Sequence, residues 1–284
     1  MAVHDHLLTL SCQDRVGIVY AVTGYLAAAD CNILDSQQFG DPRASRFFMR
    51  VHFDSPDELT AAELRQSFEP VGEQFQMDWQ IHDNAIPCKT MVLVSKFGHC
   101  LNDLLYRSQL GSLNAEVAAV VSNHPDLGAM AASYGVPFHH LPVDASNRFA
   151  QEAAIMALIE RHRIDLVVLA RYMQVLSDEF CRTLAGHAIN IHHSFLPSFK
   201  GARPYQQAYD RGVKLIGATA HFVTAELDEG PIIDQEVVRV DHSHGPERLV
   251  ALGRDLESVA LARAVQAHAE RRVLLNGTKT VVFR

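Results

Sequence analysis

Three polar residues of this chain offer the groups that acyl chemistry needs, namely an amide, an imidazole and a carboxylate. Asn190 and His192 lie two residues apart at the end of an apolar run, so both side chains leave the same face if that run is a strand. Asp228 lies in a loop just before a Gly-Pro break, which could bring a carboxylate to the imidazole. These three groups would polarise a carbonyl and exchange protons without a nucleophilic serine or cysteine.

A single histidine is more often a partly buried structural group, and this is the alternative interpretation of His192. Here, however, other polar residues gather at the predicted strand ends, where open parallel sheets bind ligands. We therefore interpret the cluster as a site. Its further members are His193, Ser194, Lys200, Gly201 and His221.

The first part of the chain alternates strands and helices in the order βαββαβ, which predicts a small ferredoxin-like module. Its second helix begins at a capping box, in which Thr60 and Glu63 can satisfy each other's free backbone donors. The expected strands are 7–12, 33–39, 46–53 and 75–81, and the first helix is 18–29.

The pattern changes after a short aperiodic stretch that contains a proline, and we predict domains at 1–83 and 90–284 joined by a linker at 84–89. Short, fully apolar strands then alternate with helix-length segments, as in a mostly parallel, Rossmann-like α/β sheet. The expected strands are 91–94, 117–121, 166–169, 188–191, 215–223 and 232–240, followed by a helix at 246–271 and an extended piece at 273–283.

Composition excludes several classes of protein. With 284 residues, of which 48% are hydrophobic, the chain can build two packed cores. A net charge of −8 argues against nucleic acid as the main partner. The five cysteines are scattered and suggest neither disulfides nor a zinc ribbon. No secretory signal or membrane span is evident, so we predict a cytoplasmic protein.

Two histidine-rich stretches could suggest a metal site. They are His139-His140 and His242-Ser243-His244, and neither has further ligands at a known spacing. Surface or capping histidines explain them better, so we predict no metal.

The residues around His192 carry a family resemblance. The run 190–197, Asn-Ile-His-His-Ser-Phe-Leu-Pro, resembles a signature of folate-dependent formyltransferases, and 217–223 with 227–233 resembles their second signature. The resemblance covers about residues 89–284 and implies a formyltransferase-like catalytic domain. It also implies that the catalytic residues are Asn190, His192 and Asp228.

Two departures point to one branch of that family. Transferases to nucleotides hold phosphate in a glycine-rich loop after the first strand, where this chain has Ser95-Lys96-Phe97-Gly98-His99-Cys100, a poor phosphate cradle. His193 replaces the signature proline, which makes the stretch similar to the 10-formyltetrahydrofolate deformylases. The N-terminal module resembles an ACT domain, a pairing that is also typical of these deformylases.

The resemblance implies hydrolysis of 10-formyltetrahydrofolate to formate and tetrahydrofolate, with formate supplied for purine biosynthesis and one-carbon pools balanced. The folate is then the substrate, and no tightly bound cofactor is expected. Residues 171–176 look like the family's pterin loop, although the side chains of Met173 and Leu176 could equally pack in the core. Lys200 and Arg203 are weaker candidates for the glutamate tail. The pterin-binding candidates are Met173, Gln174, Val175 and Leu176.

The ACT resemblance implies an amino-acid effector, with glycine or methionine as candidates, and a homo-oligomer, tetrameric or hexameric. A glycine at a strand-to-helix turn leaves free amides that can receive a carboxylate. In the alternative interpretation Gly17 only permits the turn and Asp14 caps the helix. The predicted effector residues are Asp14, Arg15, Val16, Gly17 and Ile18.

Two other functions stay open. A formyltransferase to an amine acceptor such as glycinamide ribonucleotide would use the same three catalytic groups, and the missing glycine-rich loop argues against it. A non-catalytic sensor of folate and amino acid would not require Asn190, His192 and Asp228 together.

Overall fold

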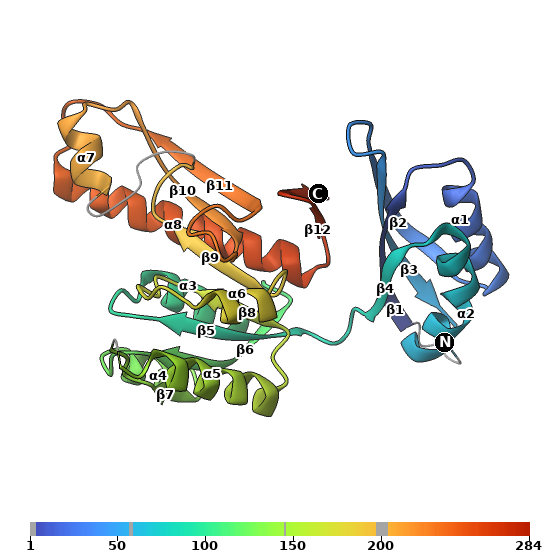
Figure 1. The fold of residues 1–284 in the computed structure, drawn as a ribbon, viewed down its shortest axis with the longest axis horizontal. Coiled ribbons are helices and arrows are strands. Elements are labelled where there is room, and N and C mark those ends of the chain that lie inside the picture. Colours follow the sequence, from blue (N-terminus) through green and yellow to red (C-terminus); the bar gives the residue numbers. More distant parts are fainter. Residues whose placement is uncertain (1–3, 57–58, 145, 197–203) are drawn as a thin grey trace. The chain divides into compact units, whose positions relative to one another are not determined.

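The computed structural model describes residues 4–56, 59–144, 146–196 and 204–284, which form two compact units (Figure 1). The first unit comprises residues 1–87, 270–276 and 281–284, and the second comprises 88–269 and 277–280. Each unit is described by itself. In the part of the chain described, no helix is long and apolar enough to cross a membrane.

The first unit is the predicted ferredoxin-like module, with its two helices on one face of an antiparallel sheet of strand order β2-β3-β1-β4 (Figure 1). Leu8 and Leu10 of β1 and Met49 and Val51 of β3 are buried in one core with residues of both helices. The elements are β1 (His4–Gln13), α1 (Ile18–Ala28), β2 (Asn32–Asp41), β3 (Arg46–Ser55), α2 (Ala61–Phe75) and β4 (Asp78–Asp83).

The predicted capping box is present at the start of α2. The Thr60 amide donates to Glu63 Oε2 at 2.8 Å, and the Glu63 amide donates to Thr60 Oγ1 at 3.3 Å. The predicted last strand was wrong at its start, because Phe75 still belongs to α2 and β4 begins at Asp78. The alternation of apolar residues that predicts the strand already starts at Phe75, in the last turn of α2, so the sequence pattern does not show where the helix ends and the strand begins.

The second unit is a seven-stranded sheet of order β11-β10-β9-β8-β5-β6-β7. Strands β5 to β9 pair in parallel with one another, and β10 pairs antiparallel with both β9 and β11, which gives the mostly parallel Rossmann-like sheet. Its strands are β5 (Cys88–Val94), β6 (Ala115–Ser122), β7 (Phe138–His140), β8 (Leu166–Leu169), β9 (Ala188–His192), β10 (Leu215–Phe222) and β11 (Ile232–Arg239).

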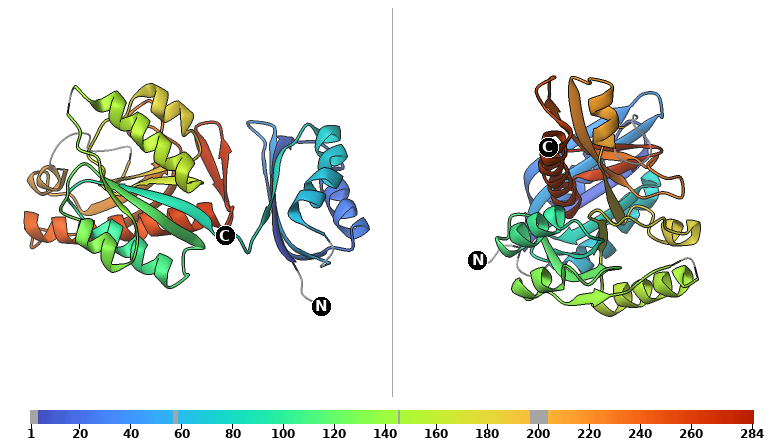
Figure 2. Two further views of the ribbon diagram at one scale, coloured as in Figure 1. Left: turned by 90° about the horizontal axis from the view of Figure 1, so that it is seen from below. Right: turned by 90° about the vertical axis from the view of Figure 1, so that its left-hand side faces the viewer.

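Helices cover both faces of this sheet (Figure 2). Met91 and Leu93 share a core with residues of α5 and α6, and the alternating Val92 and Val94 face the other side. The helices are α3 (His99–Gln109), α4 (Gly128–Ser133), α5 (Arg148–His162), α6 (Asp178–Thr183), α7 (Pro204–Asp210) and α8 (Pro246–Ala269), and a hairpin of β12 (Val273–Asn276) and β13 (Lys279–Val282) ends the chain.

The two units divide between Pro87 and Cys88, inside the stretch predicted as linker, and β5 already begins at Cys88. Most of the C-terminal residues after 269 group with the first unit, although the sequence pattern placed them in the second domain. The reason is a set of contacts within the first unit. Arg50 donates to the Glu270 carbonyl at 3.1 Å, and Asn276 Nδ2 donates to Asp41 at 2.8 Å.

The order of the strands in this sheet determines where the candidate site lies. The chain leaves β5 for β6 on one side and later returns to β8 on the other side, so the sheet has a switch point at β5. The carboxyl ends of β5, β8 and β9 therefore lie at one edge. The residues that follow them include Phe97, Arg171 and His193, and all three line one cavity.

Candidate active site

Strands β9 and β10 position the predicted amide and imidazole. Asn190 lies opposite His221 and His192 lies opposite Thr219 in this antiparallel pair. Because opposite residues share a face of the sheet, the amide of Asn190 and the ring of His221 meet, with Asn190 Nδ2 3.2 Å from His221 Nε2. The other ring nitrogen of His221, Nδ1, lies 2.8 Å from the Phe222 carbonyl oxygen.

These contacts fix the protonation of His221 and the orientation of the Asn190 amide. Nδ1 of His221 donates to the Phe222 carbonyl, which leaves Nε2 as an acceptor for the amide N–H of Asn190. An amide nitrogen carries two N–H groups, so Asn190 keeps one for a ligand.

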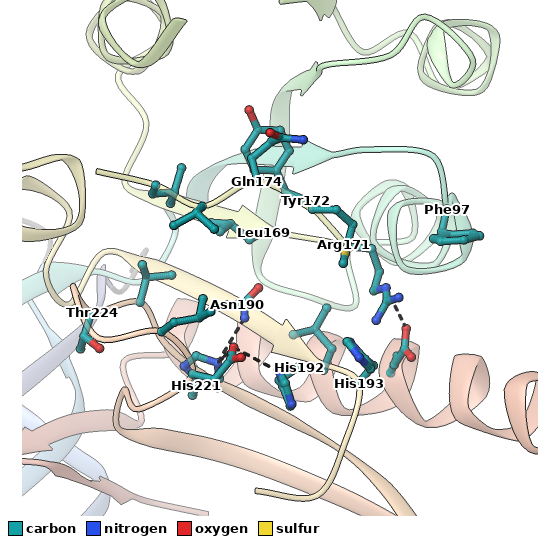
Figure 3. A pocket seen from close by; sticks show the side chains of 18 of the residues that line it. Phe97, Leu169, Arg171, Tyr172, Gln174, Asn190, His192, His193, His221 and Thr224 are labelled. Atoms are coloured by element: carbon teal, nitrogen blue, oxygen red, sulfur yellow. Dashed lines mark hydrogen bonds and ion pairs between the residues drawn. The ribbon is translucent and has the colours of Figure 1, made fainter. Parts of the chain in front are cut away.

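Asp228 completes the cluster, as predicted. Its Oδ1 lies 3.1 Å from His192 Nδ1 and 3.7 Å from His221 Nε2 (Figure 3). Nε2 of His192 is buried and has no hydrogen-bond partner among the described residues. The carboxylate therefore holds one nitrogen of the imidazole, and the other is free for a reacting group.

The loop that carries Asp228 is held in an unusual backbone conformation. Asp228 has a φ of 58°, a left-handed value that aspartate tolerates better than most residues. Two residues later, a Cβ on Gly230 would lie 1.7 Å from the Phe222 carbonyl oxygen and 3.1 Å from His221 Nδ1. Only glycine lets the loop approach β10 so closely, and this approach brings the carboxylate to the histidines.

The electrostatics of the cluster keep Asp228 ionised. Burial alone would raise the pKa of its carboxyl group, but the contacts with His192 and His221 outweigh burial and hold the pKa well below its ordinary value. Next along the chain, burial and the nearby Arg171 and His192 lower the pKa of His193 to about 4. His193 is thus a neutral ring, stacked on that of His192 with centroids 4.9 Å apart.

These residues line a cavity of about 680 Å³, which is large enough for a drug-sized ligand. All four predicted pterin-loop residues, from Met173 to Leu176, line it, and so do His193 and His221. Met173 has more than half of its surface exposed, so the alternative of core packing was wrong for this side chain, whereas Leu176 packs against the core as that alternative predicted. Ser194 is buried and is not among the residues that line the cavity, so its role in binding stays a prediction. Lys200, Gly201 and Arg203 lie outside the described residues.

Buried partners hold the pterin loop at both ends. Ser95 Oγ accepts from the Met173 amide at 3.0 Å, and Tyr172 donates to Gln151 Oε1 at 3.1 Å. At the other end, Glu152 accepts from the Ser177 amide at 2.7 Å. The backbone between these contacts is held in place for a ligand, as a pre-formed site requires.

A second polar cluster in the same cavity was missed from the sequence. Glu257, on α8, is 1% exposed and accepts from His99 Nε2 at 2.7 Å and from the Tyr205 hydroxyl at 2.8 Å. Arg171 Nε lies 3.5 Å from the same carboxylate. An acidic residue on the apolar face of a long helix was the available signal, because such a group is rarely buried without partners.

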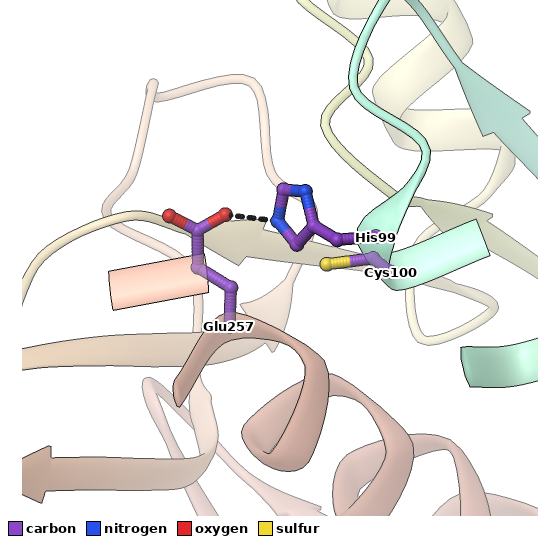
Figure 4. Close-up of side chains that lie close together, drawn as sticks. All are labelled: His99, Cys100 and Glu257. Carbon is purple, nitrogen blue, oxygen red and sulfur yellow. Dashed lines mark hydrogen bonds and ion pairs between the residues drawn. The ribbon is translucent and has the colours of Figure 1, made fainter. Parts of the chain in front are cut away.

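One group of described side chains could offer three metal ligands within 4.8 Å of one another, from His99, Cys100 and Glu257 (Figure 4). His99 and Glu257 are already hydrogen-bonded to each other. Burial, followed by the charge of Glu257, raises the pKa of the Cys100 thiol well above its ordinary value. His99 and Glu257 thus form a hydrogen-bonded pair beside a buried thiol.

The predicted effector loop lies between β1 and α1 of the first unit. Gly17 is the N-cap of α1 with a φ of 99°, and no side chain caps the helix, so Asp14 does not have the capping role. The Asp14 amide donates to the Ser45 carbonyl at 2.9 Å, and the Val16 side chain is fully exposed. Arg15 lies 4.6 Å above the Phe75 ring. The first turn of α1 thus has no side-chain cap among the described residues, and the effector role of the loop stays a prediction.

The comparisons with known proteins agree with this geometry. A family model described as formyl transferase matches residues 88–265, and an ACT domain model matches 6–69. A formyltetrahydrofolate deformylase from Corynebacterium sp. (strain P-1) is 52% identical over 98% of both chains. The chain belongs to the formyltetrahydrofolate deformylase family.

Comparison with solved structures also shows greater similarity to a deformylase than to a transformylase. The deformylase family member from Burkholderia mallei is 53% identical, with a TM-score of 0.95 over 99% of this chain and 100% of that one. A glycinamide ribonucleotide transformylase from Symbiobacterium toebii is 32% identical, with a TM-score of 0.66 over 70% of this chain and 95% of that one. The transformylase thus matches only part of the chain, whereas the deformylase matches it end to end.

Proposed function

We propose that this chain hydrolyses 10-formyltetrahydrofolate to formate and tetrahydrofolate. The observation that carries the proposal is the contact of His192 Nδ1 with Asp228 beside the Asn190 amide, in a cavity large enough for a folate. A sensor that only binds would not need an imidazole whose one nitrogen is held by a carboxylate while the other is free. Membership of the deformylase family supports the same reaction.

Water attacks first. Nδ1 of His192 donates to Asp228, so Nε2 carries the lone pair and accepts a proton from the attacking water. The water oxygen bonds to the formyl carbon, and the carbonyl electrons move to the oxygen. The spare N–H of Asn190 stabilises this oxyanion, and one such donor contributes about 3 kcal/mol to transition-state stabilisation.

Collapse of the tetrahedral intermediate then breaks the bond between the formyl carbon and N10. The proton held on His192 passes to N10, and the formic acid that forms loses its remaining proton to solvent and leaves as formate. Asp228 stabilises the imidazolium throughout, because its lowered pKa keeps it ionised. His221 orients the Asn190 amide and is a positioning residue in this mechanism.

We further propose that the pterin ring lies against residues 173–176, where exposed apolar side chains and a fixed backbone offer a flat slot. Lys200 and Arg203 remain candidates for the glutamate tail.

The remaining proposals concern the setting of the enzyme. We propose a cytoplasmic homo-oligomer that provides formate for purine biosynthesis and responds to glycine or methionine through the loop at 14–18. The ACT domain match over residues 6–69 supports an amino-acid effector.

The test is formate release by the purified protein from 10-formyltetrahydrofolate with no amine present. We expect steady turnover, and a loss of kcat of about 10²- to 10³-fold in Asn190→Ala. His192→Ala should lose at least as much, since it removes the proton carrier. Formate release that depends on an added amine would instead indicate a transferase, and unchanged turnover in both variants would remove the assigned roles.

A further inference from the structure

The cavity has two different ends, with the catalytic residues between them. Figure 3 shows Asn190 and His192 in the middle, Thr224 toward one side, and Phe97 with Arg171 toward the other. Exposed apolar residues of the loops at 173–176 and 224–228 line the first end, which is suited to the flat folate. A molecule that receives the formyl group must then reach the carbon from the second end.

Five side chains line the second end, and we name them the acceptor wall: Phe97, His99, Arg171, Tyr205 and Glu257. The polar groups of the wall pair with one another. His99 and Tyr205 both donate to the buried Glu257 carboxylate, and Arg171 Nε lies 3.5 Å from it. These partners outweigh the effect of burial and lower the pKa of Glu257, so the carboxylate stays charged.

Three helices contribute to the wall, with His99 on α3, Tyr205 on α7 and Glu257 on α8. The Arg171 guanidinium lies 5.7 Å from the Phe97 ring centroid. Tyr205 fits against α8 because residue 253 is glycine, and a Cβ there would lie 2.0 Å from the tyrosine hydroxyl. The wall is thus built into the packing of the second unit and does not depend on one loose side chain.

The wall offers little to a large acceptor. Glu257 is 1% exposed, and both of its oxygens already accept hydrogen bonds, one from His99 and one from Tyr205, so they offer little to the hydroxyl or amine groups of an incoming molecule. Among the described residues, Nε and Nη1 of Arg171 have no hydrogen-bond partner, both are buried, and Nε forms the ion pair with Glu257. A bulky acceptor would have to break a charged network, and breaking a buried ion pair is costly.

We infer that the acceptor wall selects water as the formyl acceptor by excluding amines from the side of the cavity opposite the folate. The inference rests on the proposed function and makes the five wall residues specificity-determining. In this account His192 activates any acceptor that reaches it, and the wall decides which acceptor does.

The test measures how formyl groups partition between water and an amine. The protein is supplied with 10-formyltetrahydrofolate and glycinamide, and N-formylglycinamide and formate are both quantified. The variants are Phe97→Ala, His99→Ala and the two together. Phe149→Ala, an exposed aromatic on α5 that does not line the cavity, is the matched control, and Tyr205→Phe keeps the ring.

We expect the wild type and Phe149→Ala to form almost only formate, and we expect Tyr205→Phe, which keeps the ring and loses the hydrogen bond to Glu257, to form less formylated amine than the opened variants. Opening the wall in the double variant should raise the ratio of formylated amine to formate by about tenfold or more. This ratio does not depend on the folded fraction, because unfolded molecules contribute to neither product. Phe97→Ala removes no hydrogen bond, so it provides the test even if His99→Ala fails to fold.

The outcomes separate the two proposals. A wild type that releases no formate would contradict the proposed function. A wild type that hydrolyses the folate while every opened variant keeps the same ratio would overturn the acceptor wall alone. Formylated amine from the wild type at a level similar to formate would also overturn it.

Discussion

At the scale of single residues, the geometry around Asp228 decides the chemistry of the cavity. The carboxylate lies 3.1 Å from Nδ1 of His192, so it sets the tautomer of that ring and leaves Nε2 free. The same carboxylate lies 3.7 Å from His221, which in turn orients the Asn190 amide. The carboxylate therefore positions the base, and the ring of His221 positions the oxyanion donor.

We predict that Asp228→Asn lowers kcat by roughly 10²- to 10⁴-fold and leaves the protein folded. Asparagine tolerates the left-handed backbone at this position but cannot stabilise an imidazolium. Glu226→Gln removes an exposed charge from the same loop and is the matched control. Steady-state kinetics and thermal unfolding would check the prediction, and a kcat within a factor of a few of the wild type would contradict it.

A second residue-scale prediction concerns pH and stability in the first unit. Burial, followed by the charges of Arg271 and Arg65, lowers the pKa of His82 to about 4. As the pH falls below about 6.5, His82 becomes protonated in the unfolded chain, whereas in the folded unit it stays neutral until about pH 4. The free energy of unfolding should therefore fall between these values, by at most about 3 kcal/mol from this group.

Denaturant unfolding of the wild type and of His82→Gln across this pH range would measure that contribution. The variant should show a shallower loss of stability as the pH falls. An identical pH dependence in both proteins would show that His82 does not contribute.

At the scale of elements, the strand register of β9 and β10 and the loop that follows them build the site. Gly230 allows the loop to lie against the Phe222 carbonyl. We predict that Gly230→Ala displaces the loop, lowers kcat at least tenfold and destabilises the second unit by a few kcal/mol, as overpacking does. Gly245→Ala, where a Cβ meets nothing within 4 Å, should change neither quantity. Wild-type kinetics in Gly230→Ala would contradict this account of the loop.

The sequence patterns predicted the elements well and the site in part. The apolar strands and the capping box at Thr60 are local features, and they were predicted correctly apart from the start of β4 and the short strand β7. The pairing of Asn190 with His221 depends on a register between separate strands, which no local pattern shows. The acceptor wall was missed for the same reason, since His99 and Glu257 are 158 residues apart.

At the scale of the whole molecule, the two units carry separate binding proposals. A non-hydrolysable folate analogue should slow hydrogen exchange in residues 166–176 and 222–230, and glycine or methionine should slow it in residues 14–18. At about 100 times its Kd, either ligand should stabilise the unit that binds it by about 2.7 kcal/mol. Folate protection in the first unit, or amino-acid protection confined to the second, would contradict the assignment.

Water is the proposed acceptor of the formyl group, and turnover in water labelled with ¹⁸O tests this proposal. The purified protein would turn over 10-formyltetrahydrofolate in labelled water without an amine, and formate would be analysed by mass spectrometry. We expect one ¹⁸O atom in each formate, and we expect as much tetrahydrofolate as formate. Formate without the label, or no formate until an amine is added, would contradict it.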